Sequence, residues 1–168
     1  MNMDKEKLTS EVISAIKQLV DSLQNAQTSD KSSDVKIGPE VVISDLGLES
    51  LEILALIDVL ERKFSIGYLE VGMVQNLTVG ELCRKVVWHQ CRIEVKGKLI
   101  KLLRDMGVKT DYSKMLEEER IFWDWGFDSM DVEELTCEIE HCFDIDLSGC
   151  NLSDYTFGEV IDCIAERV

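Results

Sequence analysis

Residues that interrupt helices are scarce in this chain, which has one proline among 168 residues. Proline is excluded from helix interiors, so its near absence leaves long helices possible along most of the sequence. Long apolar runs are also missing, because the longest, at 53–60, is interrupted by Asp58. A segment that is so short and carries a charge cannot span a bilayer, and we therefore expect no membrane insertion.

Basic residues are in the minority along the chain. Lysine and arginine together number 18, against 33 aspartate and glutamate residues, which gives a formal net charge of −15 at pH 7. A surface of this sign repels the phosphates of nucleic acids and of anionic lipids. We therefore expect protein partners that carry basic patches rather than nucleic acids or membranes.

The six cysteines include no Cys-x-x-Cys pair, the spacing typical of metal and redox motifs. We expect them to be reduced, with most of the thiols packed in the interior. The first seven residues, Met1-Asn-Met-Asp-Lys-Glu-Lys7, contain no apolar signal region. The sequence therefore predicts a cytoplasmic protein.

One sequence block occurs twice, as Asp45-Leu-Gly-Leu-Glu-Ser-Leu-Glu52 and as Asp124-Trp-Gly-Phe-Asp-Ser-Met-Asp131. Its serines are Ser50 and Ser129. Two further pairs of blocks follow in the same order in each half: Phe64-Ser-Ile and Phe143-Asp-Ile, then Thr78-Val-Gly-Glu and Thr156-Phe-Gly-Glu. Three matching blocks in the same order indicate a duplicated structural unit.

Helical periodicity predicts an all-α fold. Apolar residues recur at steps of three or four in four segments, 8–23, 53–64, 95–106 and 132–143. Thr78 with Glu81, and Thr156 with Glu159, have the spacing of capping boxes, which predicts a helix start after each threonine. The polar stretch at 25–34 is typical of a loop.

We divide the chain into a first unit, 1–89, and a second unit, 90–168. A unit of roughly 80 to 90 residues is large enough to form its own core. No linker rich in proline, serine or glycine separates the two. The last helix of the first unit is therefore expected to run almost directly into the first helix of the second, through a short, helical connection.

The repeated serines lack the surroundings of a catalytic nucleophile. An activated serine needs a base beside it, usually a histidine. The chain has two histidines, His89 and His141, and they occupy non-equivalent places in the two halves. We therefore predict no catalytic residue at Ser50 or Ser129 and no enzymatic activity of the chain itself.

What each serine offers is a hydroxyl group at the start of a helix. The amide groups and the helix dipole there favour an anion, so a phosphoester on that oxygen would be stabilised. The alternative is that Ser50 and Ser129 only cap their helices. The recurrence of the same flanking residues in both halves favours a serine that another enzyme modifies.

Both octets resemble the Asp-Ser-Leu attachment motif of acyl carrier proteins. The Phe-x-Ile and Thr-x-Gly-Glu blocks also match that family, so the resemblance covers nearly the whole chain as two copies. It implies that each unit is a four-helix bundle with one short helix. It further implies that Ser50 and Ser129 accept 4′-phosphopantetheine from coenzyme A, through a separate phosphopantetheinyl transferase that uses magnesium. The arm would carry acyl groups as thioesters in fatty acid, polyketide or related biosynthesis.

The two copies depart from this family pattern in different ways. Glu49 precedes Ser50 where the family usually has aspartate, whereas Asp128 precedes Ser129. Aspartate is a good N-cap and glutamate is not among the preferred ones. We expect both serines to be modified, with Ser129 the firmer assignment. Met130 replaces the usual leucine, a change that conserves volume.

The helices after the serines are expected to form docking surfaces for enzymes with basic patches, including the transferase and acyl-transferring synthases. The residues that we assign to partner docking are Leu51, Glu52, Leu54, Met130, Asp131 and Glu134. The first unit presents the apolar pair Leu51 and Leu54, whereas the second presents Met130 followed by Glu133. The surfaces therefore predict units that are not interchangeable, on a chain that we expect to be monomeric.

Two alternatives remain open from the sequence. In the first, the units have the carrier fold but one or both serines stay unmodified, and the chain is an interaction module. In the second, 144–149 binds calcium, since Asp144, Asp146, Ser148 and Gly149 match the start of an EF-hand loop. Tyr155 stands where that loop needs a glutamate, so we expect no metal site.

Overall fold

The computed structural model describes residues 5–26, 37–67, 69–112, 117–119 and 124–168. Within these ranges the regular elements are helices and 3-10 turns, together with one isolated antiparallel bridge between Val42 and Thr78. The prediction of an all-α fold is confirmed for this part of the chain. None of the described helices combines the length and the apolar character that crossing a membrane requires.

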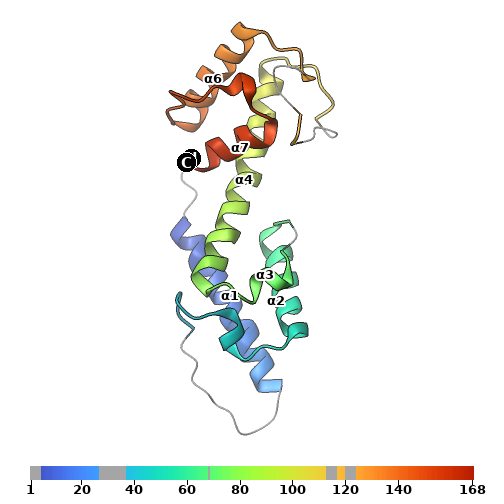
Figure 1. Ribbon diagram of the computed structural model, residues 1–168, viewed down its shortest axis with the longest axis vertical. Coiled ribbons are helices and arrows are strands. Elements are labelled where there is room, and N and C mark those ends of the chain that lie inside the picture. Colours follow the sequence, from blue (N-terminus) through green and yellow to red (C-terminus); the bar gives the residue numbers. More distant parts are fainter. Residues whose placement is uncertain (1–4, 27–36, 68, 113–116, 120–123) are drawn as a thin grey trace. The chain divides into compact units, whose positions relative to one another are not determined.

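The elements follow one another as shown in Figure 1. The helices are α1 (Lys5–Ala26), α2 (Ser50–Phe64), α3 (Val71–Val74), α4 (Val79–Asp105), α6 (Ser129–Phe143) and α7 (Phe157–Ala165), with 3-10 turns η1 (Ile43–Leu46) and η2 (Leu152–Asp154). The loop predicted at 25–34 is wrong at its first two residues, which belong to α1, and its last eight residues lie outside the described ranges.

The described residues form two compact units, and the division between them falls between Gln90 and Cys91. This point lies inside α4, which is one continuous helix where the sequence predicted two helices that meet. The amino-terminal unit contains α1, η1, α2, α3 and the start of α4. The carboxyl-terminal unit contains the rest of α4 with α6, η2 and α7. The boundary that we expected, after residue 89, is one residue away.

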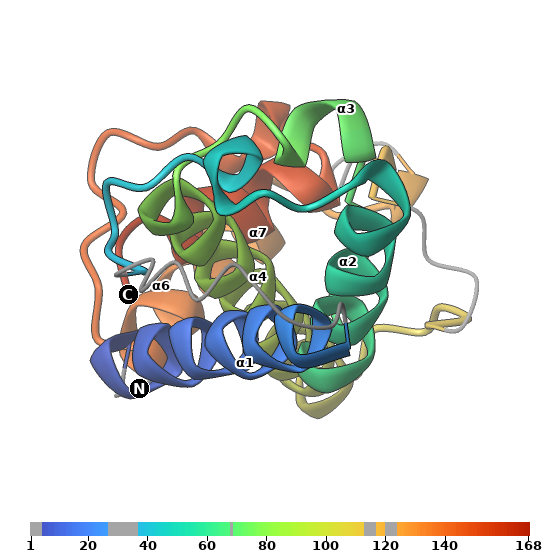
Figure 2. The same ribbon diagram turned by 90° about the horizontal axis from the view of Figure 1, so that it is seen from below.

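Each unit has its own apolar core. In the amino-terminal unit α1 and α2 contact each other, running in different directions in Figure 2, and share a core with α3 and the start of α4. Its most deeply buried large side chains are Ile16, Ile43, Leu56, Leu60 and Leu82. Those of the carboxyl-terminal unit are Leu99, Leu103, Leu135, Ile139, Phe143 and Phe157. Burial of these side chains is the main force that fixes the helices in each unit.

In both units the backbone adopts left-handed conformations at equivalent positions before and after the helix that begins with serine. Gly47 has a φ of 72° shortly before α2, and Gly126 has a φ of 70° shortly before α6. Ser65 and Asp144 end these helices in the left-handed conformation, with φ of 51° and 56°. Left-handed backbone is uncommon outside glycine, so its recurrence at equivalent non-glycine residues is evidence of a shared local design.

A carboxylate on each of these helices holds the segment that follows. The side chain of Glu61 accepts a hydrogen bond from the backbone N–H of Leu69 at 2.7 Å. In the same way Glu140 accepts from the N–H of Leu147 at 2.7 Å. Both bonds are partly buried, and a partly buried charge-assisted bond contributes more than an exposed one. Glu61 and Glu140 therefore have the same structural role in the two units.

The start of α4 packs against the loop that precedes η1. The backbone N–H groups of Val79 and Gly80 donate to the carbonyl oxygens of Val41 and Pro39, each at 2.8 Å. A Cβ atom on Gly80 would lie 2.9 Å from the Pro39 oxygen, closer than such atoms approach in proteins. Glycine is therefore required at this position, because any side chain would push the loop away from the helix.

The start of α7 repeats this arrangement in the carboxyl-terminal unit. Phe157 and Gly158 donate to the carbonyl oxygens of Glu119 and Glu117, again at 2.8 Å. A Cβ atom on Gly158 would lie 3.1 Å from the oxygen of Glu117. The Glu117 side chain accepts bonds from Lys96 and Arg92 of α4, both at 2.8 Å. These bonds, that from Lys96 first, lower the pKa of the Glu117 carboxyl group.

Candidate functional site

Ser129 is the first residue of α6, and the residue before it caps the helix. The carboxylate of Asp128 accepts hydrogen bonds from the N–H groups of Met130 and Asp131, at 2.8 and 3.0 Å. In return the Asp131 carboxylate accepts from the Asp128 N–H at 2.9 Å. Asp128 thus satisfies the exposed amides that a capping serine would otherwise serve. The alternative in which Ser129 is only the helix cap is wrong.

Ser50 occupies the same first position in α2, after Glu49 at the N-cap. Here the Glu52 carboxylate accepts a hydrogen bond from the Glu49 N–H at 2.7 Å. The capping interpretation fails for Ser50 as well, because the cap position belongs to Glu49. The two helix starts differ in strength, since aspartate is a preferred N-cap and glutamate is not.

The hydroxyl groups of Ser50 and Ser129 are exposed, and neither forms a hydrogen bond with another residue in the described ranges. Each oxygen lies at the positive end of a 15-residue helix. That end stabilises a negative charge, by about 0.3–1 kcal/mol at an exposed site. The two positions therefore combine an accessible nucleophilic oxygen with an environment that favours a phosphate ester.

A hollow with a volume of about 460 Å³ lies beside Ser50. Its lining combines polar and apolar side chains from η1, from the start of α2 and from the residue after α3: Ser44, Leu48, Glu49, Ser50, Leu51, Ile53 and Gln75. A hollow of this size and mixed lining can accept an extended group attached to the serine. Ser44 and Gln75 were not among the predicted site residues, because their approach to Ser50 depends on the fold and leaves no local pattern in the sequence.

The apolar residues assigned to docking project from the helices as predicted. Leu51 is 77% exposed, Leu54 is 46% exposed and Met130 is 70% exposed. Single exposed apolar side chains are normal on a protein surface. What makes Leu51 and Met130 candidates for partner contact is that they recur at the same position, directly after each serine. Glu133 takes the place of Leu54 in the second unit and is also exposed.

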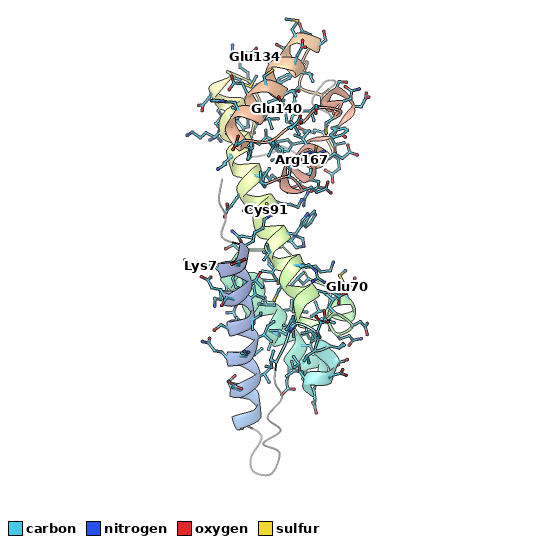
Figure 3. The ribbon with its side chains drawn as sticks, turned by 90° about the vertical axis from the view of Figure 1, so that its left-hand side faces the viewer. Lys7, Glu70, Cys91, Glu134, Glu140 and Arg167 are labelled. Atoms are coloured by element: carbon cyan, nitrogen blue, oxygen red, sulfur yellow. The ribbon has the colours of Figure 1, made fainter. Side chains whose placement is uncertain are left out.

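The acidic residues assigned to docking divide into two kinds. Glu134 lies exposed on α6 (Figure 3) and has no competing structural role among the described contacts. Glu52 and Asp131 are committed to the helix starts through their bonds to Glu49 and Asp128. They still contribute negative charge beside the serines, but their carboxylates are not available to rearrange around a partner.

His141 lies far from Ser129, at the opposite end of α6. His141 lies in the last turn of α6, twelve residues after Ser129 in the first turn. A helix rises about 1.5 Å per residue, which separates the two by about 18 Å along the axis. His89 makes an edge contact with Trp88, with ring centroids 5.3 Å apart. General-base activation of Ser129 by His141 is therefore excluded by distance.

The segment that resembles a calcium loop forms a hydrogen-bonded turn. Asp146 accepts a hydrogen bond from the Ser148 N–H at 2.7 Å. Its contacts with Ser148, the side-chain one first, lower the pKa of Asp146. In the described part of the chain, no group of three or more His, Cys, Asp or Glu side chains is arranged to hold a metal ion.

Comparisons of the chain with models of protein families, with curated proteins and with solved structures gave no match. The functional conclusion therefore depends on the residues and on their geometry.

Removing the cap beside Ser129 should destabilise the carboxyl-terminal unit. We expect Asp128→Ala to lower the free energy of unfolding by about 1 kcal/mol, because two backbone N–H groups lose their acceptor. Asp128→Asn keeps an acceptor oxygen and should be nearly neutral. Chemical denaturation followed by circular dichroism measures both. Equal losses in the two variants would show that charge, and not the capping bonds, matters here.

Proposed function

We propose that this protein is a tandem acyl carrier, with a 4′-phosphopantetheine arm esterified to Ser50 and to Ser129. The observation that carries the proposal is the repeated position of the serine. In both units it is the first helical residue, exposed and without a hydrogen-bond partner among the described residues, while its neighbour occupies the cap. A serine that is unnecessary for the helix, yet present at both helix starts, is best explained by chemistry on its oxygen.

The local surroundings of both serines suit this prosthetic group. An ester phosphate on either oxygen would lie at a helix amino terminus, where the dipole stabilises its charge. The hollow beside Ser50 has room for an extended arm. When bound, the group supplies a thiol that carries acyl chains as thioesters. The residues of the chain hold the phosphate end and present the helix surface, and they catalyse no step.

The same proposal extends to the fold of the two units. Three features of the first unit recur in the second and support two carrier-type helical bundles in series. They are the left-handed turns before and after the serine helix, the bond from a carboxylate on that helix to the segment after it, and the contacts of a loop with the start of α4 or α7. Two arms on one chain raise the local concentration of carried groups near a bound synthase. We place the protein in the cytoplasm as a monomer that serves fatty acid, polyketide or related biosynthesis.

The partners of a carrier would be a phosphopantetheinyl transferase and acyl-transferring enzymes. Their basic patches would meet the acidic surface around each serine, and the exposed apolar side chains after the serine would enter the contact. Leu51 and Leu54 form an apolar pair on α2, whereas Met130 is followed by Glu133 on α6. Because these surfaces differ in charge and apolarity, we infer that the two units engage partners with different preferences.

Intact-mass measurement tests the function directly. The full chain is incubated with coenzyme A, magnesium and a promiscuous phosphopantetheinyl transferase. We expect the mass to rise by two phosphopantetheine groups, and we expect no rise for the Ser50→Ala/Ser129→Ala double variant. Circular dichroism should show that the double variant is folded, since neither hydroxyl supports its helix. An unmodified wild-type chain under conditions that load a known carrier would refute the proposal.

A further inference from the structure

The six cysteines differ in their surroundings, although none is in a disulfide. Cys83, Cys91 and Cys163 are buried, Cys150 is half-buried, and Cys137 and Cys142 are exposed on α6. The expectation that most thiols are packed therefore holds for only half of them. One pair is distinct, because the Sγ atoms of Cys150 and Cys163 lie 3.4 Å apart.

The two sulfur atoms share a cationic neighbour. Arg167, labelled in Figure 3, follows α7 and donates from Nη1 to the Sγ of Cys163 at 3.1 Å. It donates from Nη2 to the Sγ of Cys150 at 3.3 Å. A third bond, from Nη1 to the carbonyl oxygen of Cys163 at 2.7 Å, fixes the guanidinium in place. The guanidinium group therefore holds both sulfur atoms together in one cluster.

Exposure separates the roles of the two thiols. Cys150 is half-buried in the turn before η2, so a small oxidant can reach its sulfur. Cys163 is 8% exposed in α7. Burial, followed by its contact with Cys150, raises the pKa of the Cys163 thiol to about 11. Cys163 is thus a protected, protonated thiol beside a more accessible one.

We propose that Cys150 and Cys163 form an oxidative modification site, in which a peroxide oxidises Cys150 and Cys163 then closes a disulfide. In the first step the Cys150 sulfur attacks hydrogen peroxide, forming a sulfenic acid, and the other peroxide oxygen leaves as water with the thiol proton. In the second step the Cys163 sulfur attacks the sulfenic sulfur, and the oxygen leaves as water with the thiol proton. Two thiols have then lost two electrons, and the peroxide has been reduced.

The geometry allows this bond with little movement. The sulfur atoms must approach from 3.4 Å to the bonded distance of roughly 2.0 Å. Cys150 belongs to a turn in which its N–H donates to Leu147 and the preceding Gly149 has a φ of 90°. A turn adjusts more easily than a helix, so Cys150 can move toward Cys163. The disulfide would tie the segment before η2 to α7, and it does not depend on the carrier function.

Differential alkylation of the full chain tests the proposal. The protein is treated with hydrogen peroxide, its remaining thiols are blocked with iodoacetamide, and its peptides are mapped by mass spectrometry. We expect a cross-linked peptide pair that joins Cys150 to Cys163 and is lighter by about 2 Da than the two thiol peptides. Exposed Cys137 and Cys142 are the internal control for simple accessibility. If they oxidise while Cys150 and Cys163 remain alkylated, the proposal is refuted.

Variants separate the two steps. Cys163→Ala should stop at the sulfenic acid of Cys150, which dimedone traps, whereas Cys150→Ser should give neither dimedone adduct nor cross-link at Cys163. Arg167→Gln should slow the oxidation of Cys150 on the order of threefold to tenfold, and Arg167→Lys should restore part of the rate. In the Cys150→Ser variant, dimedone labelling of Cys163 as fast as the oxidation of Cys150 in the wild-type chain would overturn the assignment of Cys150 as the first target.

Discussion

Each single-serine variant is expected to take up one phosphopantetheine group, and the remaining sites should load at different rates. Ser129→Ala leaves only Ser50, and Ser50→Ala leaves only Ser129. We expect the Ser50→Ala chain to load faster, by roughly fivefold, which corresponds to about 1 kcal/mol, the typical difference between a preferred N-cap and a poor one. Time points of intact mass with limiting transferase measure both rates.

The physical reason for this difference lies in the residue before each serine. At Ser129 the cap is a preferred aspartate that accepts from two backbone N–H groups. At Ser50 the longer Glu49 takes its place in a reciprocal capping box with Glu52, in which its side chain accepts from one backbone N–H group. A less firmly held helix start presents its hydroxyl in more orientations, so fewer encounters with the transferase are productive.

A matched substitution checks this reasoning in the amino-terminal unit. Glu49→Asp, introduced into the Ser129→Ala chain, should raise the loading rate at Ser50 toward that of Ser129. Leu54→Glu in the same background gives α2 the charge that α6 has at Glu133. This variant tests whether the exposed face of α2, rather than its N-cap, limits loading. If Glu49→Asp has no effect and Leu54→Glu raises the loading rate at Ser50 toward that of Ser129, the docking surface, and not the cap, causes the difference.

Phe157→Ala should have the largest effect on stability. Phe157 is fully buried at the start of α7 and packs against the ring of Trp125, with ring centroids 5.3 Å apart. Removing such a ring typically costs about 3–5 kcal/mol. A whole domain of this size has a stability of roughly 5–15 kcal/mol, so the carboxyl-terminal unit would be left barely folded.

Hydrogen exchange read by mass spectrometry locates this loss. Peptides from α6 and α7 should lose protection in the Phe157→Ala protein, while peptides from α1 and α2 should keep it. Phe127→Ala is the control, because Phe127 is half-buried and meets the edge of Trp125 with centroids 6.2 Å apart. Phe127→Ala should lower the free energy of unfolding clearly less than Phe157→Ala does. Equal losses in both variants would show that Trp125, and not the depth of burial, dominates this core.

Local patterns predicted those parts of the structure that neighbouring residues determine. The capping boxes at Thr78 and Thr156 form as expected, with the N–H of each threonine bonded to the glutamate three residues later. The helix after each serine starts at the predicted residue, because turn and cap signals act within a few positions. The all-helical fold followed from the spacing of apolar residues for the same reason.

Contacts between distant residues could not be predicted in this way. The approach of Pro39 to Gly80 and of Cys150 to Cys163 depends on how the elements pack, and neither pair leaves a periodic signal. Glu61 looked like one more surface carboxylate until the structure showed its bond to Leu69. The continuity of α4 through Gly97 was also only partly predictable, since glycine usually weakens a helix interior by about 1 kcal/mol.

The close packing of a loop on Gly80, and of its counterpart on Gly158, has a consequence for how the duplicated halves can diverge. At Gly80 the nearest atom is a main-chain oxygen, so a larger residue cannot be accommodated by rearranging side chains, whereas at Gly158 it would require Glu117 to shift slightly. On the solvent side of α2 and α6, where Leu54 is exposed in one half and Glu133 in the other, the packing of the fold leaves the side chain free to vary. Differences between the halves are therefore expected on the exposed helix faces, where a partner and not the fold selects the residue.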